Sequence, residues 1–143
     1  MNKMTAPVVV SRFIDAPPQR VYDAWIIPQN ASKWLFATPT GRMLRAEIDP
    51  KVGGKFRFTD RRDGQDVDHV GQYLELVPAR KIAFTFTVPK YANEETVVRV
   101  DISPKGSGTK IVLTHEGVLP EWSARTMDGW TKMLEGLAKE TST

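Results

Sequence analysis

Apolar and polar residues alternate along the middle of the chain, and this period of two is typical of strands with one buried face. In the segment 81–88, for example, Ile82, Phe84 and Phe86 share one parity and predict a buried side. The connectors between such segments are too short for crossover helices, so we expect the strands to pair antiparallel. The predicted strands are 8–15, 43–48, 55–60, 67–77, 81–88, 95–103 and 109–117.

Helical segments are predicted on both sides of this strand-rich region. Prolines at 17 and 18 end the first strand and suit the first turn of a helix, so we expect short helices at 19–27 and, after Pro28, at 29–35. Beyond Pro120 the apolar period changes to three and four residues, which predicts a long amphipathic helix. Its apolar stripe is Met127, Trp130, Leu134 and Leu137.

These elements predict one α+β domain that spans residues 1–143. A chain of this length normally forms a single core. A curved antiparallel sheet of six or seven strands that wraps around the C-terminal helix would bury the apolar side of both, with the two short helices after the first strand. Gly129 and Gly136 lie inside the predicted C-terminal helix at a cost of about 1 kcal/mol each relative to alanine, which suggests a close approach or a bend there.

Charge and composition exclude several classes of protein. Twenty basic and seventeen acidic residues give a net charge of +3 with the signs mixed along the chain, so no nucleic-acid partner is expected. The densest basic stretch, 51–62, has the period of two that suits the solvated face of a strand. The chain has no cysteine, which excludes thiolate nucleophiles, zinc–thiolate sites and disulfides and fits a reducing compartment.

The sequence also predicts where the protein is located and whether it binds a metal or a cofactor. The longest apolar runs have four residues, far below the roughly 18 that cross a bilayer, and the stretch 1–7 lacks the apolar segment of a signal peptide. We therefore expect a cytoplasmic protein without membrane insertion. Two histidines without metal-ligand spacing, and no phosphate-binding loop, indicate no metal and no cofactor.

Several short motifs resemble a known family. Residues 16–25 resemble its opening APxxVWxAW, 52–58 its hairpin VGGxFxF, and 71–78 its strand GxYxExxP. The series is completed, in the same order along the chain, by Trp34, 84–86, 108–115 and 129–130. The chain is thus identified as similar to the helix-grip START-like superfamily (SRPBCC, related to birch-pollen allergens), in the branch that resembles the C-terminal domain of the activator of the heat-shock protein 90 ATPase.

The resemblance implies a helix-grip fold and leaves several functions open. Members include lipid and hormone carriers, aromatic polyketide cyclases and other binders of small molecules. The eukaryotic co-chaperone has a separate N-terminal domain for which 143 residues leave no room, so a chaperone partner is not favoured. Small helix-grip proteins often associate, which makes a homodimer a possible state.

Two residues are candidates for acid–base chemistry. His115 shares a strand face with Ile111 and Leu113, so it faces the helix if they do; it would then either contact a ligand or be tied by hydrogen bonds to its neighbours. Glu75 shares parity with Tyr73 and would be a buried carboxylate if that face is inward, or a surface residue if its two leucine neighbours are inward. His69 is expected to be an exposed strand residue.

The favoured hypothesis is a protein that binds a hydrophobic or aromatic small molecule between the sheet and the C-terminal helix. The alternatives are a cyclase, dehydratase or hydrolase that uses the same pocket, and a co-chaperone-like interaction module. The predicted lining is aromatic for the most part and doubles as core. It consists of Trp25, Trp34, Phe56, Phe58, Tyr73, Glu75, Phe84, Phe86, His115, Met127, Trp130 and Leu134.

Overall fold

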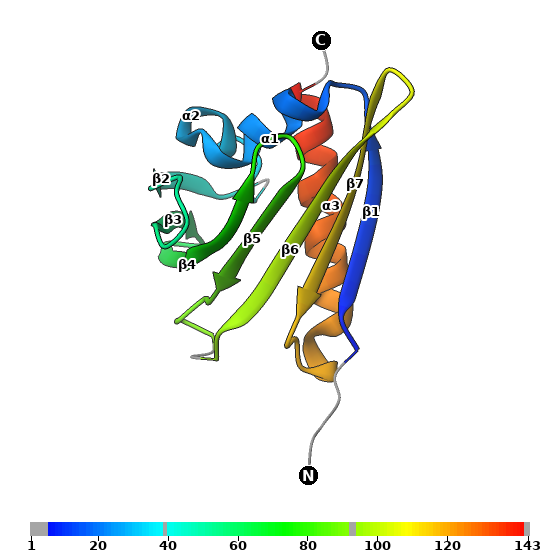
Figure 1. Cartoon of the computed structure of the whole chain (residues 1–143). Helices are drawn as coiled ribbons and strands as arrows, with labels where there is room; N and C mark the ends of the chain where they lie inside the picture. Colours follow the sequence, from blue (N-terminus) through cyan, green and yellow to red (C-terminus); the bar gives the residue numbers. More distant parts are fainter. Residues whose placement is uncertain (1–5, 39, 92–93, 142–143) are drawn as a thin grey trace.

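The computed structural model describes residues 6–38, 40–91 and 94–141, which form a seven-stranded antiparallel sheet and three α-helices (Figure 1). The expectation of a missing signal peptide rests mainly on residues 1–5, which lie outside the described residues. The strand order is β1-β7-β6-β5-β4-β3-β2. The elements are β1 (Val8–Ile14), α1 (Pro18–Ile26), α2 (Pro28–Ala31), β2 (Arg42–Ile48), β3 (Lys55–Arg62), β4 (Gln65–Val77), β5 (Lys81–Phe86), β6 (Thr96–Lys105), β7 (Gly108–Glu116), a 3-10 turn η1 (Pro120–Trp122) and α3 (Ser123–Thr141).

The C-terminal helix packs against the sheet as the hydrophobic pattern predicted. Trp130, Leu134 and Leu137 are buried, because they form one stripe on the side of α3 that faces the sheet. In Figure 1, α3 runs behind β6, β7 and β1, while β2 and β3 lie to one side of it. This is the predicted helix-grip arrangement of an α+β protein. None of the described helices is long and apolar enough to cross a membrane.

The second helix is shorter than the sequence predicted. A helix at 29–35 was expected, but α2 ends at Ala31 and the chain continues in turns. The turns place Trp34 across from α1, where its indole Nε1 donates a 3.0 Å hydrogen bond to the carbonyl oxygen of Ala24. The ring of Trp34 meets that of Trp25 edge-on at 4.7 Å. Burial of this ring therefore decides the local backbone more than helix propensity does.

A β-bulge in β4 changes which residues face inward. Tyr73 pairs with Phe84, but the next inward pair is Leu76 with Ile82, because the register shifts between Tyr73 and Glu75. Paired residues of an antiparallel ladder point to the same face, so the bulge reverses the parity of the strand.

Aromatic rings fill the space between the helices and the strands β3, β4 and β5. A void of about 10 Å³ is left there, lined by Trp25, Leu35, Phe36, Phe56, Phe58, Tyr73, Ile82 and Phe84. A void of this size holds at most about one water molecule. Most of the predicted pocket lining is thus solid core, and the hollow expected under α3 is closed along this part of the sheet.

Gly71 makes this aromatic packing possible. It pairs with Phe56, whose ring lies over it; a Cβ at position 71 would overlap both that ring and the carbonyl oxygen of Thr85. Gly129 in α3 is the opposite case, since nothing lies within 4 Å of a Cβ built there.

We predict opposite effects of alanine at these two glycines. Gly71→Ala should lower the free energy of unfolding by at least about 2 kcal/mol, because backbone and a core ring must move. Gly129→Ala should raise it by up to about 1 kcal/mol through helix propensity. Urea unfolding followed by circular dichroism measures both, and a neutral Gly71→Ala would refute the packing described here.

Candidate functional site

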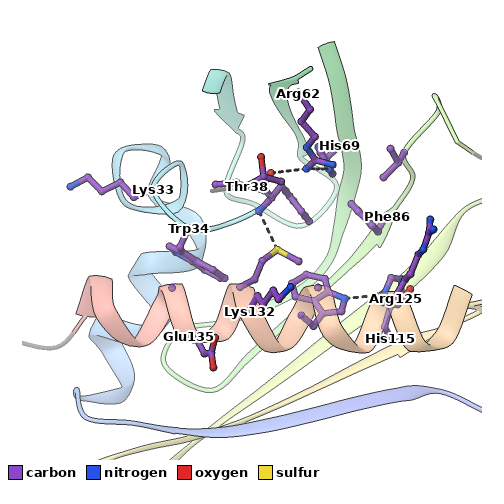
Figure 2. A pocket seen from close by; sticks show the side chains of 18 of the residues that line it. Lys33, Trp34, Thr38, Arg62, His69, Phe86, His115, Arg125, Lys132 and Glu135 are labelled. Carbon is purple, nitrogen blue, oxygen red and sulfur yellow. Dashed lines mark hydrogen bonds between the residues drawn. The ribbon is translucent and has the colours of Figure 1, made fainter. Parts of the chain in front are cut away.

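An open cleft of about 780 Å³ runs along one side of α3, from Arg125 to Lys139. One wall is a side of α3, and the other is formed by the turns after α2 together with β3, β4, β5 and β7. Figure 2 shows these side chains converging on the space above the helix. The lining residues are Lys33, Trp34, Phe36, Ala37, Thr38, Arg62, His69, Phe86, Val88, Tyr91, His115, Arg125, Thr126, Gly129, Trp130, Lys132, Met133, Glu135, Gly136 and Lys139.

Three near-parallel rings form one wall of the cleft. Phe36 stacks with His69 at 4.8 Å and with Phe86 at 5.0 Å, with interplanar angles of 10° and 6°. His69 and Phe86 are themselves tilted by only 16°. Phe86 is half-buried, whereas the other two rings are buried. A flat ligand ring can therefore lie parallel to this wall and contact Phe86 directly.

The backbone of Phe36 is held in an unusual conformation at this wall. Its φ is +59°, in the left-handed region that costs a residue with a side chain about 1–2 kcal/mol. Two contacts hold it: its N–H donates to the Met133 sulfur at 3.2 Å, and its carbonyl oxygen accepts from Arg62 Nη2 at 3.1 Å. Phe36 also borders the small inner void, so its ring separates the cleft from the aromatic core.

Arg62 joins the ring wall to a buried carboxylate. Its Nε donates to Asp60 Oδ2 at 2.8 Å, and the same oxygen accepts from Thr38 Oγ1 at 3.0 Å. The Asp60 side chain is only 1% exposed, and its Oδ1 has no hydrogen-bond partner among the described residues. Arg62 Nη2 also lies 3.2 Å from His69 Nε2, and Nη2 can only donate. His69 Nε2 is therefore the acceptor, and Nδ1–H points to the carbonyl oxygen of Phe58, 3.4 Å away.

His115 is tied into the fold through both ring nitrogens. The indole Nε1 of Trp130 donates to His115 Nδ1 at 3.0 Å, so the proton of the neutral ring is on Nε2. That nitrogen lies 2.7 Å from Thr96 Oγ1, which in turn donates to the carbonyl oxygen of Phe86 at 3.0 Å. Each donor in this chain has one acceptor. The hydrogen bonds therefore favour a structural role for His115 over proton transfer to a ligand.

Both histidines are held neutral at physiological pH. Burial lowers the pKa of His69 to about 4, and the adjacent Arg62 charge acts in the same direction. Burial alone lowers the pKa of His115 to about 4. A proton on either ring would also remove the acceptor that Arg62 or Trp130 uses.

The structure separates the predicted lining residues into three groups. Those that border the cleft are Trp34, Phe86, His115 and Trp130. Those buried in the core away from it are Trp25, Phe56, Phe58, Tyr73, Phe84 and Leu134. Glu75 and Met127 belong to neither group.

Glu75 lies on the outer face of the sheet, yet neither of the two predicted alternatives holds in full, because Tyr73 is buried and, of the two leucine neighbours, Leu76 packs against the core while Leu74 is 46% exposed. Its side chain is 44% exposed and its carboxylate lies 3.8 Å from the ammonium of Lys81. The β4 bulge is the reason, since it turns Leu76 inward in place of Glu75. Met127 is 46% exposed and does not border the cleft. It is two residues from Gly129 and thus about 200° away around the helix.

Two predictions for the strand faces were wrong. His69 was expected to be exposed, but it is 5% exposed because it shares the inward parity of Val67 and Tyr73 and pairs with Phe58. Arg62 was grouped with the solvated basic residues of 51–62, yet it continues the inward parity of β3 and its side chain is 27% exposed. The signal that could have found the pair was an acid and a base, Asp60 and Arg62, on the parity of two phenylalanines.

Comparison with known proteins identifies the class of this fold. The family model described as Activator of Hsp90 ATPase homolog 1-like protein matches residues 15–141, so the chain belongs to this family. Among proteins with curated descriptions, none matches the sequence.

Solved structures have the same fold over nearly the whole chain. A protein from Chromobacterium violaceum is 26% identical with a TM-score of 0.88, covering 96% of this chain and 97% of that one. A protein from Aeromonas hydrophila, described as AHSA1-like, is 18% identical with a TM-score of 0.82, covering 94% and 91%. A protein from Colwellia psychrerythraea, described as an Aha1 dimer, is 17% identical with a TM-score of 0.75, covering 96% of each chain.

The two buried histidines predict a loss of stability on mild acidification. Their pKa values in the folded protein, about 4, lie below the ordinary 6.5, so the unfolded chain binds more protons between these values and stability falls as the pH drops through this window. Between pH 7 and pH 5 the free energy of unfolding should fall by roughly 4 kcal/mol for the two together.

NMR titration of the two imidazoles, alongside urea unfolding at each pH, tests this prediction. Neither ring should titrate above pH 5, and His115→Gln should remove about half of the pH dependence. Titration of either imidazole near pH 6.5 in the folded protein would contradict the hydrogen-bond assignment given above.

Proposed function

We propose that the protein binds a hydrophobic small molecule that contains a flat ring, and that the binding site is the open cleft beside α3. The observation that carries the proposal is that a cleft of about 780 Å³ has a wall of aromatic rings. Ligand pockets for small molecules usually have about 300–1,000 Å³ and are lined by apolar and aromatic side chains with a few polar groups. Members of this family of folds are usually ligand-binding or co-chaperone-like, which agrees with this proposal and also with the alternative of a co-chaperone-like interaction module.

The geometry favours binding without proton transfer. Glu75, one of the two candidate acid–base groups, lies on the outer face of the sheet. His115, the other, borders the cleft but both of its nitrogens are engaged by Trp130 and Thr96. The two do not converge on one point of the cleft, as a general acid and base would.

The helix wall of the cleft is shaped to admit a ligand. Gly129 borders the cleft with open space around it, so the ligand can approach the backbone of α3 there. Gly136, two turns further along, borders the same cleft and faces Trp34. Gly129 therefore leaves room for a ligand, whereas Gly136 allows the close approach of Trp34, whose Cβ would lie 3.2 Å from a Cβ at position 136.

We also propose that the protein forms a homodimer and that it is located in the cytoplasm. The relative from Colwellia psychrerythraea is described as a dimer, which motivates the first. The absence of cysteine motivates the second. Light scattering after size exclusion should give twice the 16.1 kDa chain mass, and a mass of one chain at about 100 µM would exclude the dimer.

Filling the cleft at Gly129 should abolish ligand binding without unfolding the protein. The neutral probe N-phenyl-1-naphthylamine, whose fluorescence rises in apolar surroundings, should bind the unmodified protein with a saturable signal. Gly129→Phe should weaken this binding by at least about tenfold, because its ring would occupy the ligand's place.

Gly129→Ala is the matched control, since it changes the helix but leaves the cleft open, and it should bind the probe as the unmodified protein does. Equal binding by Gly129→Phe and Gly129→Ala, or no saturable binding by either, would refute the cleft as the site. A co-chaperone-like interaction through another surface would be unaffected by Gly129→Phe.

A further inference from the structure

The Arg62 guanidinium is held rigidly at the wall of the cleft. Three of its five N–H groups are used inside the protein: Nε–H by Asp60, and the two of Nη2 by the Phe36 carbonyl oxygen and His69. Nη1 makes no hydrogen bond to any described residue. The side chain is 27% exposed, and Figure 2 shows it at the rim of the ring wall beside His69.

Asp60 positions this cation without occupying its cleft side. The carboxylate is buried and is absent from the lining of the cleft, whereas Arg62 borders it. Because Asp60 binds Nε, it fixes the orientation of the planar guanidinium, and the Nη1 edge is left for another acceptor. An arginine held in this way loses little rotamer entropy when it binds a ligand.

The charged residues around the cleft favour an anion. Five of the lining residues described are basic and one, Glu135, is acidic; the basic ones are Lys33, Arg62, Arg125, Lys132 and Lys139. Two of the lysines are partly compensated from outside the cleft, Lys33 by Glu140 at 3.6 Å and Lys132 by Asp128 at 3.0 Å. Both lysine side chains are more than half exposed, so solvent screens them. Arg62 is the more buried and the more fixed cation.

The cation and the ring wall are adjacent. Arg62 Nη2 lies 3.2 Å from His69, which stacks on Phe36 in the wall that Phe86 completes. A flat ring placed against Phe86 therefore has its edge within reach of Arg62. An acceptor group attached to that ring can accept a charge-assisted hydrogen bond from an N–H of Nη1.

We propose that the ligand of the cleft is an aromatic oxyanion, a flat ring that carries a carboxylate or a similar acidic group, and that Arg62 is the residue that binds this group. The inference rests on the proposed function, because it names the ligand class of the same site. The ring lies against Phe86, and an oxygen of the oxyanion accepts a hydrogen bond from Nη1 of Arg62.

A matched pair of ligands tests the proposal on the unmodified protein. 2-Naphthoate and 2-naphthamide have nearly the same shape and differ in charge. Calorimetry at 150 mM salt should show that the carboxylate binds about 10- to 100-fold more tightly than the amide, the range expected for a hydrogen bond to a charged group. Equal affinity, or tighter binding of the amide, would overturn the proposal.

Binding of the neutral probe N-phenyl-1-naphthylamine shows whether a negative result contradicts the ligand class alone or the binding function as well. Binding of the neutral N-phenyl-1-naphthylamine without a preference for 2-naphthoate would overturn the ligand class and leave the binding function standing. Absence of binding by all three compounds would overturn both. Preference for the carboxylate supports the proposal in either the presence or the absence of strong probe binding.

The role of Arg62 is tested by a charge-neutral double variant. Arg62→Gln alone would leave Asp60 buried without its cation, so the variant is Asp60→Asn with Arg62→Gln. It should bind 2-naphthamide as before and lose the preference for 2-naphthoate. Lys132→Gln, which removes an exposed cation of the same cleft, is the control and should change either affinity by less than about threefold.

Two results would reassign the anchor. A double variant that keeps the carboxylate preference, or a Lys132→Gln variant that loses it, would show that a rim lysine and not Arg62 recognises the anion. Circular dichroism establishes that each variant is folded, and if the double variant fails to fold, the ratio of the two affinities in the unmodified protein still decides whether the ligand class is correct.

Discussion

The placement of α3 depends on one chain of hydrogen bonds, buried at its start and partly buried beyond, that crosses four elements. It runs from the indole of Trp130 on α3 to His115 on β7, then to Thr96 on β6 and the carbonyl oxygen of Phe86 on β5. Apolar burial alone would let an amphipathic helix rotate by part of a turn on the sheet. A directional bond from the largest side chain of the stripe fixes the rotation, and with it the side of α3 that borders the cleft.

The interior is filled where aromatic rings meet and open along the side of α3 that borders the cleft. Along β3, β4 and β5 the inward positions carry aromatic rings, and Trp25 and Trp34 meet them from the helices. The last inward rings before the cleft are His69 and Phe86, and Phe36 is stacked on both. Beside these rings α3 presents Gly129, which has open space around it and borders the cleft.

Much of the fold could be predicted from hydrophobic periods, because each strand and the long helix bury one continuous side. The stripe of Trp130, Leu134 and Leu137 and the alternation in β5 are examples. The family model then identified the chain as a member of the Activator of Hsp90 ATPase homolog 1-like family. The short helix α2 was predicted too long, because the docking of Trp34 on α1 outweighs local helix propensity.

The site was less predictable, because it depends on features with no local signal. Parity placed Glu75 with Tyr73, but a bulge between them reverses the faces of β4, and nothing in the strand's composition marks a bulge. Arg62 was predicted to lie on the solvated face of a strand, but it lies on the inward face, where it pairs with the buried carboxylate of Asp60. Whether a ring is core or pocket wall depends on side-chain volumes summed over the whole sheet, which is why Phe86 and Phe84 could not be told apart.

Phe36 has a consequence for how this scaffold can vary. Its ring borders both the cleft and the small void among the core rings, and its backbone is held by a thioether and a guanidinium rather than by regular secondary structure. The depth of the chamber is therefore set by one side chain on a turn, and not by the sheet or the helix. Substitution of Phe36 by a smaller residue would extend the cleft toward Tyr73, while every strand pairing stayed in place. The length of the ligand can therefore evolve separately from the fold.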